Sequence, residues 1–257
     1  MRRKCERLVL KFGSGTLARA SGASLERQQF LRLAREVAAL MRNGRQCIIV
    51  SSGAVAAGMS VLALKERPND LATIQACAAV GQSKLMREYE TAFSRYKLHV
   101  AQLLLTHSDL DSRTRHANAR NTLERLLERG SVVPIINEND SVAVEELRFG
   151  DNDRLSAEVA MLAHAGLLIM LTSVNGLMDA SGAVVPRVTN IDEAERLVRS
   201  ERGKFSVGGM TSKLQAARMA TSAGIPTVIA NGRKAGLLEA ILAGEAIGTR
   251  FVTHARR

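Results

Sequence analysis

Residues 132–153 of the chain read VVPIINENDSVAVEELRFGDND. The apolar run Val132–Ile136 is typical of a buried strand, and it leads directly into Asn137-Glu138-Asn139-Asp140. A short excursion then ends in a second polar cluster, Gly150-Asp151-Asn152-Asp153. Polar groups that follow a buried strand lie at the carboxyl edge of a sheet, where open α/β folds bind ligands. Turn and helix-cap chemistry explains either cluster alone, but two clusters around one excursion indicate a ligand site.

Apolar strands and helical patterns alternate on both sides of this stretch. Buried strands are expected at residues 7–12, 47–50, 98–105, 132–136, 167–171 and 226–230. Helical spacing covers residues 25–42, with Ser24 as N-cap, and also 71–93, 114–128, 153–163 and 191–200. A short strand at 183–188 and an edge strand at 248–252 complete the pattern. This alternation predicts an α/β protein with one doubly wound, mainly parallel sheet and helices on both faces.

Composition limits the partners that the protein can have. The 257 residues carry a formal charge of +11, but the positive residues are dispersed and aromatic residues make up only 3%, so no nucleic-acid binding is expected. Three widely spaced cysteines favour a reducing compartment, the cytoplasm. Neither a signal peptide nor a membrane span is expected. The histidines do not pair at ligand spacing, so no protein-held metal is expected either.

Glycine-containing turns occur at Gly13–Gly15, Ser51–Gly53 and Gly208–Gly209. Such turns let backbone N–H groups approach phosphate oxygens. The first turn continues to Ala18 and matches the dinucleotide fingerprint Gly-x-Gly-x-x-Gly/Ala, which makes a nicotinamide or flavin enzyme a competing interpretation. That fingerprint requires a helix directly after the glycines and an acidic residue after the second strand, whereas a polar loop and Ser51-Ser52 are expected here. A Walker A loop is also absent from the sequence.

Two lysines accompany the glycine turns. Lys11 ends the first apolar strand, and Lys213 is expected in the first turn of a helix after Gly208-Gly209. Phosphoryl transfer mainly requires cations and N–H donors around three charged oxygens, and converging lysines with glycine loops supply both. Solvated surface lysines are the alternative, although a lysine inside an apolar strand is poorly explained in that way.

Several motifs follow one another in order from Lys11 to about Gly248. They are Lys11–Gly15, Ser51–Gly58, Ala79–Gln82, Asn118–Thr122, Asn137–Asp140, Gly150–Asp153 and Gly208–Lys213. Together they resemble the glutamate 5-kinase family of the amino acid kinase superfamily. The resemblance implies a three-layer αβα sandwich. It also implies an enzyme that phosphorylates the γ-carboxylate of L-glutamate with ATP and Mg²⁺, the first step of proline biosynthesis.

The resemblance assigns roles to individual residues. Lys11 and Lys213 would stabilise the transferring phosphoryl group, and Asp153 would orient both lysines. The glutamate site would consist of Ser52, Asn137, Asp140, Asp151 and Asn152. The ATP site would consist of Lys11, Gly13, Thr172, Ser173, Val207, Gly208, Gly209, Met210, Thr211, Ser212 and Lys213.

The chain departs from the family pattern at several positions. Ser173 and Met178 replace an Asp and a Tyr, which weakens the nucleoside assignment, and Arg148 and Ser206 replace a Lys and a Gly. The chain resembles the short form, with a single domain over residues 1–257 and no C-terminal RNA-modification-type domain. The resemblance further implies a homo-oligomer, feedback inhibition by proline and functional coupling to glutamate-5-semialdehyde dehydrogenase.

Two other functions stay open at this point. One is a sibling kinase whose acceptor is N-acetylglutamate, aspartate or UMP, and the other is a non-catalytic nucleotide- or RNA-binding protein. Carboxylates at Asp140 and Asp151 favour an acceptor with a free ammonium group, which N-acetylglutamate and UMP lack. Intact Lys11 and Lys213 argue against a non-catalytic protein.

Overall fold

A computed structural model describes residues 7–19, 22, 24–142, 152–200 and 207–253. Within them, eight strands form one sheet in the order β3-β4-β2-β1-β5-β7-β8-β6. The strands are β1 (Arg7–Phe12), β2 (Gln46–Ser51), β3 (His99–Leu105), β4 (Val132–Glu138), β5 (Leu167–Thr172), β6 (Arg187–Val188), β7 (Thr227–Asn231) and β8 (Thr249–Phe251). The helices are α1 (Ser14–Leu17), α2 (Arg27–Arg42), α3 (Ala54–Val61), α4 (Leu71–Phe93), α5 (His107–Asp111), α6 (Arg113–Glu128), α7 (Asp153–Leu162), α8 (Ile191–Ser200), α9 (Val207–Ser222) and α10 (Leu237–Ala243), with a 3₁₀ turn η1 (Ser94–Tyr96).

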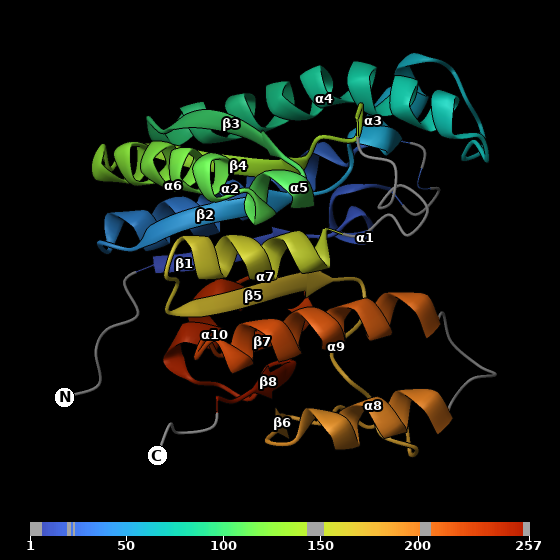
Figure 1. Cartoon of the computed structure of the whole chain (residues 1–257), viewed down its shortest axis with the longest axis vertical. Helices are drawn as coiled ribbons and strands as arrows, with labels where there is room; N and C mark the ends of the chain where they lie inside the picture. Colours follow the sequence, from blue (N-terminus) through green and yellow to red (C-terminus); the bar gives the residue numbers. More distant parts are fainter. Residues whose placement is uncertain (1–6, 20–21, 23, 143–151, 201–206, 254–257) are drawn as a thin grey trace.

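The sheet is parallel except at one junction, where β8 runs antiparallel to β7. Strand β1 lies at its centre, and Lys11 pairs in register with Val50 of β2 and Met170 of β5. The carboxyl ends of β1, β2, β4 and β5 therefore meet at one edge of the sheet (Figure 1). The α/β prediction with a mainly parallel sheet is confirmed.

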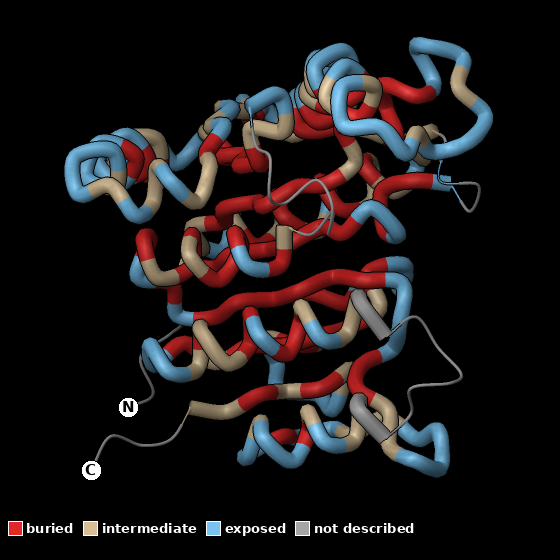
Figure 2. Tube along the Cα trace, turned by 45° about the vertical axis from the view of Figure 1, so that its right-hand side comes forward, coloured by how far each residue is buried: buried red, intermediate tan, exposed pale blue. Residues whose placement is uncertain are grey.

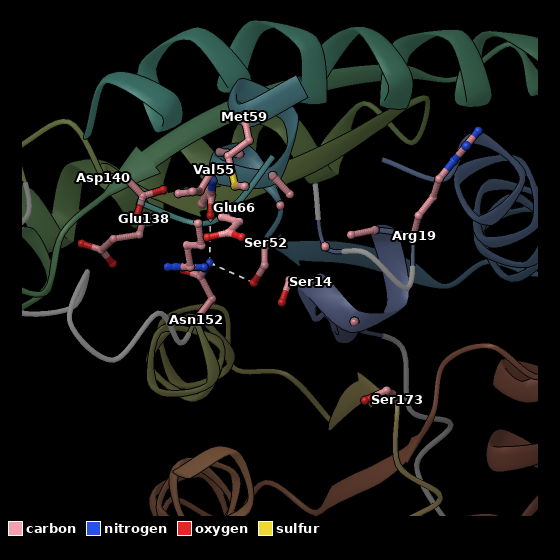
Figure 3. Close-up of a pocket in the computed structure, with 18 of the residues that line it drawn as sticks. Ser14, Arg19, Ser52, Val55, Met59, Glu66, Glu138, Asp140, Asn152 and Ser173 are labelled. Atoms are coloured by element: carbon pink, nitrogen blue, oxygen red, sulfur yellow. Dashed lines mark hydrogen bonds between the residues drawn. The ribbon is translucent and has the colours of Figure 1, made fainter. Parts of the chain in front are cut away.

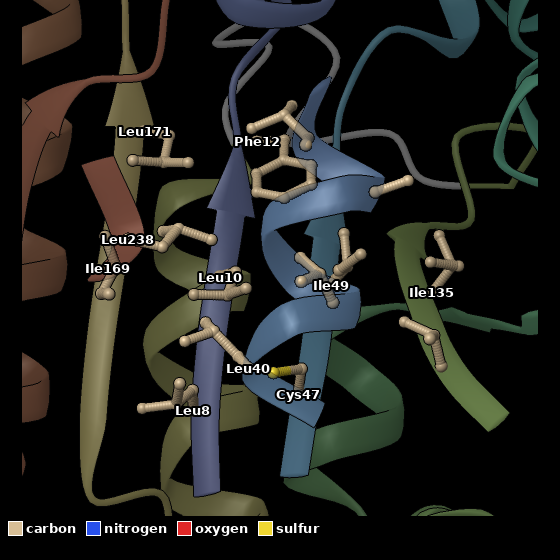
Figure 4. Packing of buried hydrophobic residues seen from close by; sticks show 14 of the residues in the cluster. Leu8, Leu10, Phe12, Leu40, Cys47, Ile49, Ile135, Ile169, Leu171 and Leu238 are labelled. Atoms are coloured by element: carbon tan, nitrogen blue, oxygen red, sulfur yellow. The ribbon is translucent and has the colours of Figure 1, made fainter. Parts of the chain in front are cut away.

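Two apolar layers cover the two faces of the sheet. Leu8, Leu10 and Phe12 of β1 pack with residues of α2, α4 and α10 (Figure 4). Val9 points to the other face, where α6, α7 and α9 supply the packing partners. The central strands are buried along their length (Figure 2). Successive side chains of a strand alternate between faces, so Lys11 shares the face of Val9 and lies under α7 and α9.

Helices α3 and α4 approach each other closely through two glycines. A Cβ atom at Gly58 would lie 1.8 Å from the carbonyl oxygen of Cys77, and one at Gly81 would lie 1.8 Å from that of Ala54. Only glycine permits this backbone approach. The contact seats α4 against the first turn of α3, beside the carboxyl edge of the sheet.

Two expected element boundaries and one expected strand position were wrong. Helix α2 begins at Arg27 with Glu26 as its N-cap, not at Leu25 with Ser24, because Leu25 forms an isolated bridge with Ala18. The strand expected at 183–188 is reduced to Arg187–Val188. Strand β8 was expected at an edge but lies between β7 and β6.

The chain around two glycine turns also differs from expectation. The one-turn helix α1 follows Gly13 directly, where a polar loop was expected. Helix α9 already begins at Val207, so Gly208 and Gly209 belong to its first turn and Lys213 to its second. Among the described residues, no helix is both long and apolar enough to span a membrane.

Candidate active site

Asp153 lies between the two predicted lysines. It is the first residue of α7 and is fully buried. The ammonium nitrogen of Lys11 lies 2.5 Å from its Oδ1, and that of Lys213 lies 2.9 Å from its Oδ2. Strand β1 supplies the first lysine and α9 the second, so three elements distant in sequence form one cluster. These three residues are called the lysine–aspartate triad below.

The triad has more positive than negative charge. Two ammonium groups and one carboxylate give a net charge of +1, with Lys11 4% and Lys213 9% exposed. Lys213 also donates to the carbonyl oxygen of Gly209 at 2.8 Å, and Ser212 donates to Asp153 Oδ2 at 3.1 Å. These hydrogen bonds fix the lysine head group. Two buried cationic donors held in fixed positions can stabilise an anion beside them.

Asn152, the residue before Asp153, joins the ends of β2 and β4. Its side-chain nitrogen donates to the carbonyl oxygen of Ser51 at 2.8 Å, to Asn137 Oδ1 at 2.9 Å and to Ser52 Oγ at 3.2 Å. Asn137 in turn donates from Nδ2 to Gln82 Oε1 of α4 at 2.9 Å. Asn152 thus contacts both Ser52 and Asn137, two other residues predicted for the glutamate site.

A second side chain of α4 supports the end of β2. The hydroxyl groups of Tyr89 and Ser51 lie 2.8 Å apart, and Ser51 donates to the carbonyl oxygen of Ser52 at 3.0 Å. Burial raises the pKa of Tyr89, so its phenol keeps its proton and can donate to Ser51. Helix α4 therefore holds the ends of both β2 and β4.

A cavity of about 710 Å³ opens beside these residues (Figure 3). Glu138, Asp140 and Asn152 lie on one side of it, and Ser14 and Arg19 on the other. Ser52 and the first turn of α3 line it as well, and Ser173 and Arg233 lie toward β5 and β7. The triad borders this cavity through Asn152 and does not itself line it.

Two of the glycine turns lie beside the cavity or the triad. Gly53 precedes α3 with φ +105°, a left-handed conformation that favours glycine, and both Gly53 and Ala54 line the cavity. A Cβ atom at Gly13 would lie 3.2 Å from the Leu171 carbonyl oxygen and 3.6 Å from Lys11 Nζ. The turn after β1 thus lies directly against the triad and β5.

The structure describes some of the residues predicted for the ATP site. Thr172 ends β5, and its carbonyl oxygen accepts from the Gly232 N–H at 2.8 Å. Ser173 lies beside Gly15, where a Cβ atom would come within 3.2 Å of its Oγ. The α9 positions predicted for this site are Val207, Gly208, Gly209, Met210, Thr211, Ser212 and Lys213, and the side chains are described only from 209 onward. Asp151, Arg148 and Ser206 lie outside the described residues.

Three residues at the site were missed in the sequence. Glu138 is 5% exposed and lines the cavity. It belongs to the stretch quoted at the start, but no role was predicted for it. Arg233 donates to the carbonyl oxygens of Gly15 at 3.0 Å and Ala18 at 2.6 Å, and so fixes the turn after β1. Gln82 stands in a motif that carried the family resemblance, but nothing in the sequence pointed to Asn137 as its partner.

Comparison with known proteins identifies the family. Residues 6–231 match the model of the amino acid kinase family. The chain belongs to the amino acid kinase family.

Relatives of this amino acid kinase are similar along almost its whole length. A glutamate 5-kinase of Moorella thermoacetica is 50% identical over 261 residues, covering 99% of this chain and 68% of that protein. A glutamate 5-kinase of Thermus thermophilus is 48% identical over 257 residues, covering 98% of this chain and 68% of that protein.

Solved structures show the fold that this amino acid kinase shares. Two structures of N-acetylglutamate synthase from Neisseria gonorrhoeae match it, one with coenzyme A and L-arginine (TM-score 0.66, 15% identity) and one with coenzyme A and N-acetyl-glutamate (TM-score 0.70, 16% identity). The matches cover 97% of this chain in both cases but only 62% and 60% of the synthase chains. At this identity the likeness concerns the fold alone.

Proposed function

We propose that this protein transfers the terminal phosphoryl group of ATP to the γ-carboxylate of L-glutamate, the first step of proline biosynthesis. The lysine–aspartate triad carries the proposal, because it places two buried cations next to a cavity lined by acceptor-binding groups. The glutamate 5-kinases that resemble this chain along almost its whole length supply the identity of the acceptor.

The triad accounts for the transfer step. A γ-carboxylate oxygen bonds to the terminal phosphorus of ATP while the bond to the bridging oxygen breaks, which leaves ADP and L-glutamyl 5-phosphate. A glutamate carboxyl group with a pKa of about 4.3 is already ionised at neutral pH, so no general base is needed. Lys11 and Lys213 would stabilise the phosphoryl group in transit, while Asp153 holds both lysines in place.

The side of the cavity that Asn152 and Asp140 line would bind the amino acid. Ser52, Asn152 and Asp140 line it, and the buried carboxylate of Glu138 adds to the negative potential there. These groups suit the ammonium group of an amino acid. Asp151 and Asn137 stay in the proposal as glutamate-site residues.

ATP would enter from the side of β5 and α9. Gly13, Thr172, Ser173 and the first turns of α9 would surround it, next to the triad. Mg²⁺ would accompany ATP and take its ligands mainly from phosphate oxygens and water. Both oxygens of Asp153 already contact lysines, so the triad does not suit a cation.

The remaining parts of the proposal concern the cellular setting. Residues 1–257 would act as one amino acid kinase domain in the cytoplasm, assembled as a homo-oligomer. Proline would act as feedback inhibitor, and glutamate-5-semialdehyde dehydrogenase would consume the labile acyl phosphate.

An assay of ADP release across acceptors tests the function. Purified protein with Mg-ATP should release ADP with L-glutamate but not with N-acetylglutamate, aspartate or UMP. Hydroxylamine should trap the product as a hydroxamate, because the product is an acyl phosphate. Comparable turnover with N-acetylglutamate or UMP would contradict the proposal.

A further inference from the structure

Gln82 on α4 has no role in the proposed reaction, yet its side chain contacts a residue of the predicted glutamate site. Its Oε1 accepts a hydrogen bond from Asn137 Nδ2 at 2.9 Å, across 55 residues of sequence. Gly81 permits this reach, because its missing side chain lets α4 lie against the backbone of Ala54. A glycine that seats the helix is thus followed directly by the side chain that contacts β4.

The direction of the hydrogen bonds can be worked out from one backbone carbonyl. The carbonyl oxygen of Ser51 can only accept, so Asn152 must turn its amino group toward the strand ends. Asn137 must then present its oxygen to Asn152 and its amino group to Gln82. Gln82 consequently has to present an acceptor, whichever way its amide is assigned.

This direction decides which side-chain atom of Asn152, a residue that lines the cavity, is left for a ligand. Its two amino hydrogens are shared among Ser51, Ser52 and Asn137. The remaining polar atom is the carbonyl oxygen Oδ1, which can only accept. Glu138 and Asp140 line the same side of the cavity and also only accept when ionised.

We propose that Gln82 is a positioning residue that selects an acceptor with a free ammonium group. By accepting from Asn137 it keeps the Asn137 oxygen turned toward Asn152, and so reinforces the direction that the Ser51 carbonyl sets and leaves Asn152 Oδ1 for that ammonium group. Without this acceptor, Asn137 could turn its amino group toward Asn152, and Asn152 would then lose one of the groups that hold its side chain in place. The inference rests on the proposed function and deepens it.

Gln82 acts through its oxygen and not through its nitrogen. Its Nε2 is buried without a hydrogen-bond partner among the described residues. Glutamate at this position would keep the acceptor and remove an unpaired donor. Methionine would keep the length but leave Asn137 Nδ2 without an acceptor.

Steady-state kinetics of matched variants test the inference. In Gln82→Met, the KM for glutamate should rise about tenfold, as expected for a buried donor left unpaired. The kcat and the KM for ATP should change less than twofold, because the lost contact concerns ground-state binding of one substrate. In Gln82→Glu, the KM for glutamate should stay within threefold of the wild-type value. Gln102→Met, the same exchange at an exposed position of β3, is the control.

Melting curves establish that each variant is folded, and Gln82→Lys, which offers only donors, replaces Gln82→Met if that variant does not fold. An unchanged glutamate KM in the folded variant overturns the inference. Equal impairment of Gln82→Glu and Gln82→Met, or an equal rise in both KM values, also overturns it. Failure of the proposed function would instead show in the wild-type protein, as absence of glutamate-dependent ADP release.

Discussion

Lys11 and Lys213 contact different oxygens of the same carboxylate, that of Asp153. Lys11 comes from strand β1 and Lys213 from helix α9, so the two lysines reach the carboxylate from different elements. Because both contacts depend on one fully buried group, the position of either ammonium nitrogen depends on Asp153.

Removal of one lysine should affect the chemical step. Lys213→Ala should lower kcat about a hundredfold, roughly 3 kcal/mol, as for loss of one oxyanion-hole donor. Its KM values should change much less, because the charge interaction strengthens in the transition state. Lys234→Ala, at an exposed position, serves as the control. Near-normal kcat in folded Lys213→Ala would show that the phosphoryl site lies elsewhere.

Asp153 and Asp140 should give different kinetic signatures. Asp153→Asn should chiefly lower kcat, since a shift of about 1 Å in preorganised groups can cost about a hundredfold. Asp140→Ala should chiefly raise the KM for glutamate, since the ammonium charge is the same before and during transfer. Measurement of both parameters for both substrates distinguishes the two roles. If Asp140→Ala lowered kcat and Asp153→Asn only raised the KM for glutamate, the roles of the two carboxylates would be exchanged.

The contact between α3 and α4 should make Gly81 sensitive to substitution. Helix propensity alone predicts that Gly81→Ala stabilises α4 by about 0.8–1.0 kcal/mol. The added Cβ would lie 1.8 Å from the Ala54 carbonyl oxygen, so the helices must separate. We expect the free energy of unfolding in urea to fall by about 1–3 kcal/mol. A gain in stability would show that α3 and α4 are not packed this closely.

The stability of the protein should depend on pH through Glu124. Hydrogen bonds from Arg7, at 2.7 and 2.9 Å, lower the pKa of Glu124 below its ordinary value. A lowered folded-state pKa adds stability above the unfolded pKa of about 4.3, and this stability is lost as the pH falls through the folded value. The difference in Tm between wild type and Glu124→Gln should thus shrink between about pH 6 and pH 3. A constant difference would contradict this assignment.

The sequence predicted the helices and strands better than it predicted the contacts between residues distant in sequence. Strand β1 and helix α4 have the expected bounds, because uninterrupted apolar runs and helical spacing are local signals. Lys11 was recognised because a charge inside an apolar strand is unusual. Arg233 and Gln82 were missed because the atoms they contact lie 218 and 55 residues away, and periodicity says nothing about such distances. The reversed direction of β8 was also missed, since three residues give no directional signal.

The direction of β8 affects how the protein can be handled. Phe251 pairs with Thr227, the first residue of β7, so β8 ends at the edge of the sheet opposite the cavity. A reporter or affinity module joined directly after Phe251 would therefore start on the far side of the sheet from the cavity. Immobilisation through such a module should leave both substrates free access, which makes the carboxyl-terminal side suitable for surface-based binding measurements.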